Sequence, residues 1–457
     1  MKRILIISSV SAAIATSSCG VYRQYETSQP DIVDSLYVEM PNGVGIDDSC
    51  SLGKLSWREL FTDPRLQQLI ETALDNNTDL KVARLRVKSA EESLTASRLA
   101  FLPSVSLDAN GRLSSTDGSK PTKTYSIGPS ASWEIDIFGK NLNDMRSKLA
   151  ALEYQKAYSQ AVTTGLISSV AESYYTLLML DRQLAISQRT LYNWDENIRT
   201  LTVMKRAGRS NEAAVLQAKA NRMNVEANIV NLEERIEQQS LSICSLLGIS
   251  PQKIERGEIS SVKFPDEFAI GLPLELLNNR PDVRQAEMEL AQAYYATNIA
   301  RSAFYPTLTL SGSAGWTNSG AAVSNPGSWL LSAIGNIVQP IFNRGTNRAN
   351  LKISQNRQEE ARLRFRQTLL DAGMEVNSSL ISWQNSRRSL EVDAERITTL
   401  LKAVDKTKML MKHGKANYLE VLTAQQNLLS AELSGVEDKY SEIYSVISLY
   451  HALGGGK

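Results

Sequence analysis

Alternation of apolar and polar residues predicts four β-strands, at about residues 103–113, 124–137, 306–317 and 328–341. A period of two gives each strand one apolar and one polar face. The second strand alternates most cleanly, with apolar positions at Tyr125, Ile127, Pro129, Ala131, Trp133, Ile135 and Ile137. The fourth departs from the pattern, because it is largely apolar on both faces and contains Pro340.

Two interpretations fit this alternation. A soluble sheet with one solvated face would show it, and so would membrane strands that face lipid on one side and an aqueous lumen on the other. Each strand has about the ten residues that a membrane-spanning strand needs. Four strands cannot close a barrel, for which about eight is the minimum. A membrane barrel would therefore need several chains, and three chains would supply twelve strands.

Apolar residues at helical spacing follow each strand pair and predict two long helical hairpins, at about residues 140–249 and 345–453. No proline interrupts the first helix of either hairpin. At 1.5 Å per residue, a helix of about 65 residues is roughly 100 Å long. The last helix carries a coiled-coil seam, formed by Leu419, Leu422, Gln426, Leu429, Leu433, Val436, Tyr440, Ile443, Ile447 and Tyr450.

Each hairpin is predicted to turn at a glycine, Gly208 in the first and Gly414 in the second. A left-handed residue after a helix is favourable mainly for glycine. Ser210 and Asn417 come shortly afterwards, and both are residue types that cap helix N-termini. We therefore expect them to cap the two returning helices.

The predicted elements occur twice along the chain. Matching residues recur at an offset that drifts only from 203 to 206, pairing Arg98 with Arg301, Phe101 with Phe304, Pro103 with Pro306, Gly208 with Gly414, and Leu247-Gly248 with Leu453-Gly454. Two long copies are too few for a solenoid array, so they indicate two equivalent halves of one chain. The predicted organisation is a signal peptide over 1–18, a lipid-anchored extension over 19–55, a first repeat over 56–250, a linker over 251–271 and a second repeat over 272–457.

The N-terminus has the pattern of an export signal. Lys2 and Arg3 precede a short apolar run, which is too short to span a bilayer, and small residues lead to Cys19. The placement of Cys19 resembles that of the lipidated cysteine in bacterial lipoproteins. The alternative is ordinary signal cleavage that leaves a free Cys19. After Cys19 no run of 18 apolar residues occurs, so no transmembrane helix is expected.

Composition weighs against several functional classes. The 50 Lys and Arg residues nearly balance the 49 Asp and Glu residues, and no basic stripe indicates nucleic-acid binding. Neither His413 nor His451 has an acidic cluster around it, so metal and triad chemistry lack ligands. No glycine-rich phosphate loop occurs, and we expect no enzyme. Cys50 and Cys244 are expected to be unpaired, with a disulfide as the alternative that export would allow.

Several motifs together resemble one family. They are "LPLELLNNRPDVRQAEMELAQA" from Leu272, "FYPTLTLSG", "PIFNRG" and "GKANYLEVLTAQQNLLSAEL". These segments resemble the TolC family of outer-membrane efflux factors, in its lipoprotein branch, and the resemblance covers about residues 56–454. It implies a mainly α-helical homotrimer with a twelve-stranded membrane β-barrel and a periplasmic α-helical barrel.

The resemblance also implies the function. A protein of this kind is anchored in the outer membrane by lipid on Cys19, needs no other cofactor, and extends into the periplasm. It meets a periplasmic adaptor, which couples it to an inner-membrane pump, and it serves as a passive exit duct for drugs or other small substrates. The alternatives are the same tube in type I protein secretion, or a periplasmic coiled coil or adaptor that forms no channel.

Two sets of site residues follow from the resemblance. The periplasmic gate would comprise Leu419, Glu420, Thr423 and Lys412, although Thr423 stands where the family usually has an aspartate. Leu419 has the alternative role of a seam residue that packs between helices. The hairpin tips that contact the adaptor would comprise Gly208, Arg209, Ser210, Gly414 and Lys415.

Overall fold

The computed structural model describes residues 22–26, 52–115, 117–119, 121–262, 264, 279–317 and 328–455. The predicted signal peptide, Cys19 and Cys50 lie outside these residues. The chain divides into two compact units. We call them the sheet unit, which includes Leu85–Ala157 and Arg284–Thr368, and the hairpin unit, which includes Asp31–Arg84, Tyr158–Val283 and Leu369–Lys457.

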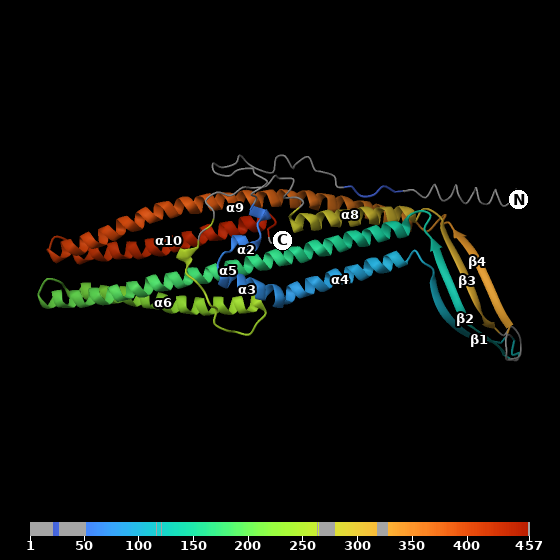
Figure 1. Ribbon diagram of the computed structural model, residues 1–457, viewed down its shortest axis with the longest axis horizontal. Helices are drawn as coiled ribbons and strands as arrows, with labels where there is room; N and C mark the ends of the chain where they lie inside the picture. The colour runs from blue at the N-terminus through green and yellow to red at the C-terminus, as the bar shows by residue number, and fades with distance from the viewer. Residues whose placement is uncertain are drawn as a thin grey trace. The chain divides into compact units, whose positions relative to one another are not determined.

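Two helical hairpins form most of the hairpin unit, as the apolar spacing predicts, and the N-terminal part of the first helix of each hairpin belongs to the sheet unit (Figure 1). Helix α5 (Lys140–Arg206) is followed by α6 (Glu212–Leu247), and α9 (Thr346–Lys412) is followed by α10 (Tyr418–Ala452). Trp194 and Leu201 of α5 pack against aliphatic residues of α6, including Val215 and Ile229. Burial of these apolar faces, rather than helix propensity alone, stabilises such long helices.

The largest core of the hairpin unit contains a group of aromatic rings. Phe61 packs edge-on against Tyr450, with ring centroids 6.2 Å apart. The Tyr174 hydroxyl donates to Asp63 at 2.5 Å, and Asp63 also caps helix α3 (Pro64–Asn76). Burial raises the pKa of the Tyr174 hydroxyl, and its bond to Asp63 raises that pKa further. The Asp63 carboxylate therefore stabilises both the aromatic core and the start of α3.

A repeated contact ties the end of each hairpin back to the start of its own repeat. At Gly248 a Cβ atom would lie 3.0 Å from the Asn76 carbonyl oxygen, and at Gly454 it would lie 2.9 Å from the Asn279 carbonyl oxygen. Both glycines have positive φ, 64° and 76°. We call these two contacts the return joints. Each return joint requires its glycine for two reasons, the left-handed backbone conformation and the close approach of the other backbone.

The second return joint is reinforced by a buried arginine. Arg280, only 5% exposed, donates to the Ala452 carbonyl at 2.7 Å and pairs with Asp282 and Glu375. In the first joint Asn77 has the equivalent role, donating to the Leu246 carbonyl at 3.0 Å. The neighbouring His451, together with Arg280, lowers the pKa of Glu375 to about 2.

Among its described residues, the sheet unit contains one antiparallel sheet of four strands in the order β1-β2-β3-β4 (Figure 1). Its strands are β1 (Ser104–Ser114), β2 (Thr122–Ile135), β3 (Thr307–Thr317) and β4 (Ser328–Val338). The register places apolar residues opposite apolar ones, as in Trp133 with Leu310. Polar residues likewise face polar ones, as in Ser106 with Ser130. The predicted alternation is thus confirmed.

Strand β4 departs from the alternation of apolar and polar faces, as its sequence predicts. Ile334 lies opposite Ser311 and Val338 lies opposite Thr307, so both apolar residues stand on the polar face of the sheet. The strand ends at Val338, three residues before the predicted end. Pro340 accounts for this end, because a proline cannot donate to the strand ladder.

The two repeats meet in the sheet at a pair of glycines. A Cβ atom on Gly128 of β2 would lie 2.2 Å from the Ala314 oxygen of β3, and one on Gly315 would lie 2.6 Å from the Ile127 oxygen. Pro129 adjoins this point and has no N–H to donate to the ladder. Close approach of the two backbones here depends on the absence of side chains.

We predict that Gly128→Ala prevents normal pairing of β2 with β3, because the added methyl would meet backbone atoms that cannot move aside. Gly111→Ala in β1 is the matched control, since a Cβ there meets nothing within 4 Å. The yield of folded protein that resists thermal unfolding should fall several-fold for Gly128→Ala alone. Equal yields for the two variants would contradict this contact.

We also predict that Gly454→Ala destabilises the protein more than Gly414→Ala does. A left-handed backbone alone costs an alanine about 1 kcal/mol. Gly414 has φ 71° but open space around it, whereas Gly454 adds the contact with Asn279. The thermal unfolding midpoint should fall further for Gly454→Ala, and identical midpoints would mean that the return joint does not hold the fold.

Candidate functional site

Both hairpin tips are built by the same backbone motif. Gly208 and Gly414 have φ 70° and 71°. Each follows a helix, and the next residue closes the motif, with Arg209 N–H donating to the Met204 oxygen at 2.8 Å and Lys415 N–H donating to the Leu410 oxygen at 2.9 Å. This pattern satisfies the carbonyl groups left open at a helix end. The predicted turning glycines are thus confirmed.

The helix caps agree with the sequence analysis in one hairpin only. Asn417 caps α10 as predicted, accepting from Glu420 N–H at 3.0 Å. In the first hairpin the prediction of Ser210 is wrong, because Asn211 caps α6 and accepts from Ala214 N–H at 2.9 Å. The internal repeat predicts the Asn211 cap, since Asn211 and Asn417 each lie three residues after their turning glycine.

The predicted gate residue Glu420 has a local role at the start of α10. Its carboxylate accepts from Asn417 N–H at 3.2 Å, while its own N–H donates to the Asn417 side chain. The two residues form a capping box, which satisfies donors that a helix N-terminus leaves open. Its negative charge also lies at the positive end of the helix dipole.

Leu419 does not pack in a seam within the chain. Its side chain is 63% exposed, whereas Leu422 is 4% exposed, so the buried seam of α10 begins one turn later. Glu420 and Thr423 are exposed as well, and Lys412 is exposed at the end of α9. The α10 residues predicted for the gate are therefore available for contacts with other chains or with solutes.

The two tips together line one groove of about 1120 Å³, which we call the tip groove. It includes the predicted residues Arg209, Ser210, Lys412, Gly414 and Leu419, so residues predicted for the adaptor contact and for the gate share one surface. Tyr418 also lines it, and burial raises the pKa of its hydroxyl to about 12. Arg209 and Lys412 give the tip groove a basic character.

The sheet exposes both of its faces. On the apolar face Leu107, Leu331 and Ile337 are 74%, 83% and 70% exposed. On the other face the Ser130 hydroxyl donates to Asp108 at 2.5 Å and lies 2.8 Å from the Ser106 hydroxyl. Exposed apolar area of this extent normally marks a surface that meets lipid or another protein.

A short N-terminal segment, residues 22–26, is held against helix α8 (Pro281–Ser302). Tyr25 N–H donates to the Tyr295 hydroxyl at 3.3 Å, and the Tyr25 ring lies 5.8 Å from that of Tyr294. The Tyr294 hydroxyl in turn donates to the Arg23 carbonyl at 3.1 Å. We call residues 22–26 the anchor segment, because only two residues separate Tyr22 from Cys19.

Within the described residues, no helix combines the length and apolar character of a membrane span. In that same part of the chain, no group of three or more His, Cys, Asp or Glu residues is arranged to hold a metal ion. Cys244 is buried and forms no disulfide within the described part of the chain, which excludes Cys50; its sulfur lies 3.5 Å from the Gln252 carbonyl oxygen.

Comparisons with known proteins agree with this architecture. The profile of the family "Outer membrane efflux protein" matches residues 69–249 and 272–455. The cation efflux system protein CusC of Escherichia coli O6:H1 is 29% identical over 97% of each chain. The probable outer membrane lipoprotein SilC of Salmonella typhimurium is 31% identical over 88% of each. The open state of the MtrE outer membrane channel of Neisseria gonorrhoeae superposes with a TM-score of 0.86 at 26% identity, covering 96% of this chain and 98% of MtrE.

Proposed function

This chain belongs to the outer membrane efflux protein family, and we propose that three copies form the exit channel of a tripartite efflux system. It is an outer-membrane transport protein and not an enzyme. The channel conducts passively, while an inner-membrane pump supplies energy and a periplasmic adaptor joins pump to channel. Its cargo is small molecules or ions delivered by that pump.

The exposed sheet is the observation that carries this proposal. Its apolar face suits lipid and its serine-rich face suits an aqueous lumen. Strands β1 and β4 lie at the two edges, and among the described residues each pairs with a neighbouring strand on one side only. Because unpaired backbone groups are costly in hydrocarbon, β1 of one protomer should pair with β4 of the next, and three protomers close a twelve-stranded barrel.

The anchor segment supports lipid attachment at Cys19. An extended chain spans at most about 3.6 Å per residue, so Cys19 lies within about 11 Å of Tyr22. Tyr22 lies close to Gly139, shortly after strand β2 ends at Ile135. A lipid on Cys19 would thus lie beside the sheet that we place in the membrane. We assign residues 19–55 as the lipid-anchored extension and residues 251–271 as the linker between repeats.

We predict that mature protein from outer membranes carries acyl chains on Cys19, detected by mass spectrometry of the N-terminal peptide. Cys19→Ser should lower the amount of assembled protein more than the transport per assembled channel, because the barrel inserts through its own apolar face. An unmodified Cys19 in membrane-bound protein would contradict the lipid anchor.

The tips are proposed to bind the adaptor through backbone shape at Gly208 and Gly414, with Arg209, Ser210 and Lys415 beside them. We predict that Gly208→Val and Gly414→Val impair efflux, because a β-branched residue is strongly strained at positive φ. The quantity of trimer in the outer membrane should be unchanged. Efflux at the wild-type rate in the double variant would remove this assignment.

The gate is proposed to form where three copies of Leu419, Glu420 and Thr423 approach the three-fold axis. Three carboxylates on one ring repel one another unless Lys412 or bound cations compensate them, and such a ring favours cations in transit. A glutamine at position 420 would keep the capping box of α10 while removing the negative charge, so the variant Glu420→Gln tests the charge alone.

We predict that Glu420→Gln lowers cation preference and raises conductance in planar bilayers without loss of assembly. Glu420→Ala should change selectivity in the same way and should also loosen the first turn of α10, seen as faster amide hydrogen exchange near Asn417. The charged gate fails if Glu420→Gln conducts like wild type while Leu419→Ala opens the pore. That result would indicate an apolar constriction and leave the channel function standing.

A further inference from the structure

Helix α6 carries a row of exposed apolar side chains at heptad spacing. Leu216, Met223 and Val230 follow one another at intervals of seven residues, and each is more than half exposed in the protomer. A seven-residue spacing places side chains along one stripe of a helix, as in a coiled coil. We call this row the α6 stripe. Among the described residues nothing covers it, and exposed apolar area of this kind marks a surface that meets another protein or lipid.

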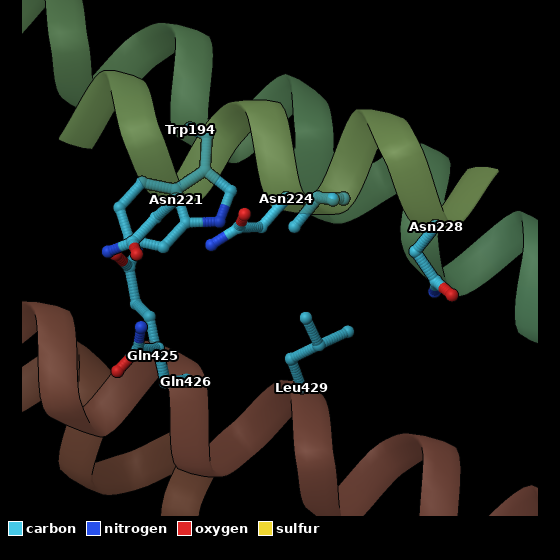
Figure 2. Close-up of a pocket in the computed structure, with 8 residues that line it drawn as sticks. Trp194, Asn221, Asn224, Asn228, Gln425, Gln426 and Leu429 are labelled. Atoms are coloured by element: carbon cyan, nitrogen blue, oxygen red, sulfur yellow. The ribbon is translucent and has the colours of Figure 1, made fainter. Parts of the chain in front are cut away.

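The internal repeat shows what kind of partner fits the α6 stripe. The equivalent residues of α10, 206 positions later in the chain, are Leu422, Leu429 and Val436. Leu422 and Val436 are buried, and Leu429 points from α10 toward Trp194 and the first hairpin (Figure 2). The same stripe is therefore covered by another helix in α10 and open in α6.

Helix α5 covers the stripe of α10. Ile186 of α5 and Val436 of α10 are 4% and 8% exposed, belong to one core and line the same groove. The residue of α9 that is equivalent to Ile186 is Val392, which is 58% exposed. Val392 and Val230 also lie the same number of residues from their turning glycines. Both halves of a second contact of this kind are thus present in the chain, and both are open.

We propose that the α6 stripe of one protomer packs against α9 of a second copy, with Val230 meeting the partner subunit's Val392. This interface repeats between copies the contact that α5 and α10 make within one copy. It joins one surface of a protomer to a different surface of the next, so that successive copies close into a ring. The inference rests on the proposed function, because it takes three copies to surround one channel, and it names the helices that join them.

The two interfaces differ in their polar contacts. Within one copy Arg189 of α5 pairs with Glu432 of α10 at 2.6 Å. The equivalent positions of α9 and α6 hold Glu395 and Glu226, which cannot form an ion pair with each other. Arg222 of α6 lies 2.8 Å from Glu226 and compensates its charge. The interface between copies therefore depends on apolar burial more than the interface within a copy does.

Cysteine cross-linking of the purified full-length protein tests this contact. Oxidation of the double variant Val230→Cys/Val392→Cys should give covalent dimers and trimers on non-reducing gels. The matched control is Asn228→Cys/Val392→Cys, because Asn228 is also exposed on α6 but its amide lies 3.5 Å from the Ser187 hydroxyl of α5. The control should give at least about ten-fold less cross-linked dimer, since a disulfide requires closely spaced Cβ atoms. The single variants measure the background from the native cysteines.

A charge exchange tests the same contact in the assembled protein. Val230→Lys should lower the temperature at which the trimer dissociates by several degrees, because it buries a charge without a partner. Addition of Val392→Glu should restore that temperature, since the two charges then compensate each other. Val203→Lys is the control and should leave the temperature unchanged, because Val203 is as exposed as Val230 but lies on α5, outside the α6 stripe.

The outcomes separate this interface from the proposed function. A trimer of the expected mass whose chains do not cross-link through Val230 and Val392, or whose dissociation temperature is unaffected by Val230→Lys, would overturn the interface and leave the channel function standing. A protein that is monomeric under the same conditions would overturn both.

Discussion

The open edges of the sheet are the constraint on which the rest of the structure depends. In the described part of the protomer, the four strands leave one side of β1 and one side of β4 unpaired, and β1 is exposed along its whole length. In a membrane interior such backbone groups must find partners, and a closed barrel provides them. A protomer with two strand pairs is therefore one part of an assembly, and its helices must be placed so that neighbouring copies meet around an axis.

The internal duplication helps to meet this requirement, because the two repeats of the chain use the same contacts. The return joints hold the end of each hairpin against the start of its own repeat, through Gly248 and Asn76 in the first and Gly454 and Asn279 in the second. Similar tips follow from the glycines at 208 and 414. The repeats differ where contacts are specific: Arg280 replaces Asn77 at the second joint, and Asn427 is exposed where Asn221 is buried. The two hairpins therefore share a backbone arrangement and differ in specific side chains.

Periodicity sufficed to predict the elements, because a strand with two unlike faces and a long helix without proline leave clear patterns. Turning glycines and the Asn417 cap were predictable for the same local reasons. Contacts between residues that are far apart in the sequence were not predictable in this way. Nothing near Gly128 in the sequence indicates that Gly315 approaches it, and a 3–4 seam cannot reveal that Leu419 is exposed while Leu422 is buried. The capping role of Glu420 was predictable from Asn417 three residues earlier, whereas the family resemblance implies a gate role for the same residue.

The central claim is that this protein completes its sheet only with copies of itself, three to a channel. Native mass spectrometry of protein extracted gently from outer membranes tests it most directly. The account predicts one dominant species with the mass of three mature chains, each lacking residues 1–18. A monomer as the dominant species, or an assembly whose chain number is not three, would contradict it.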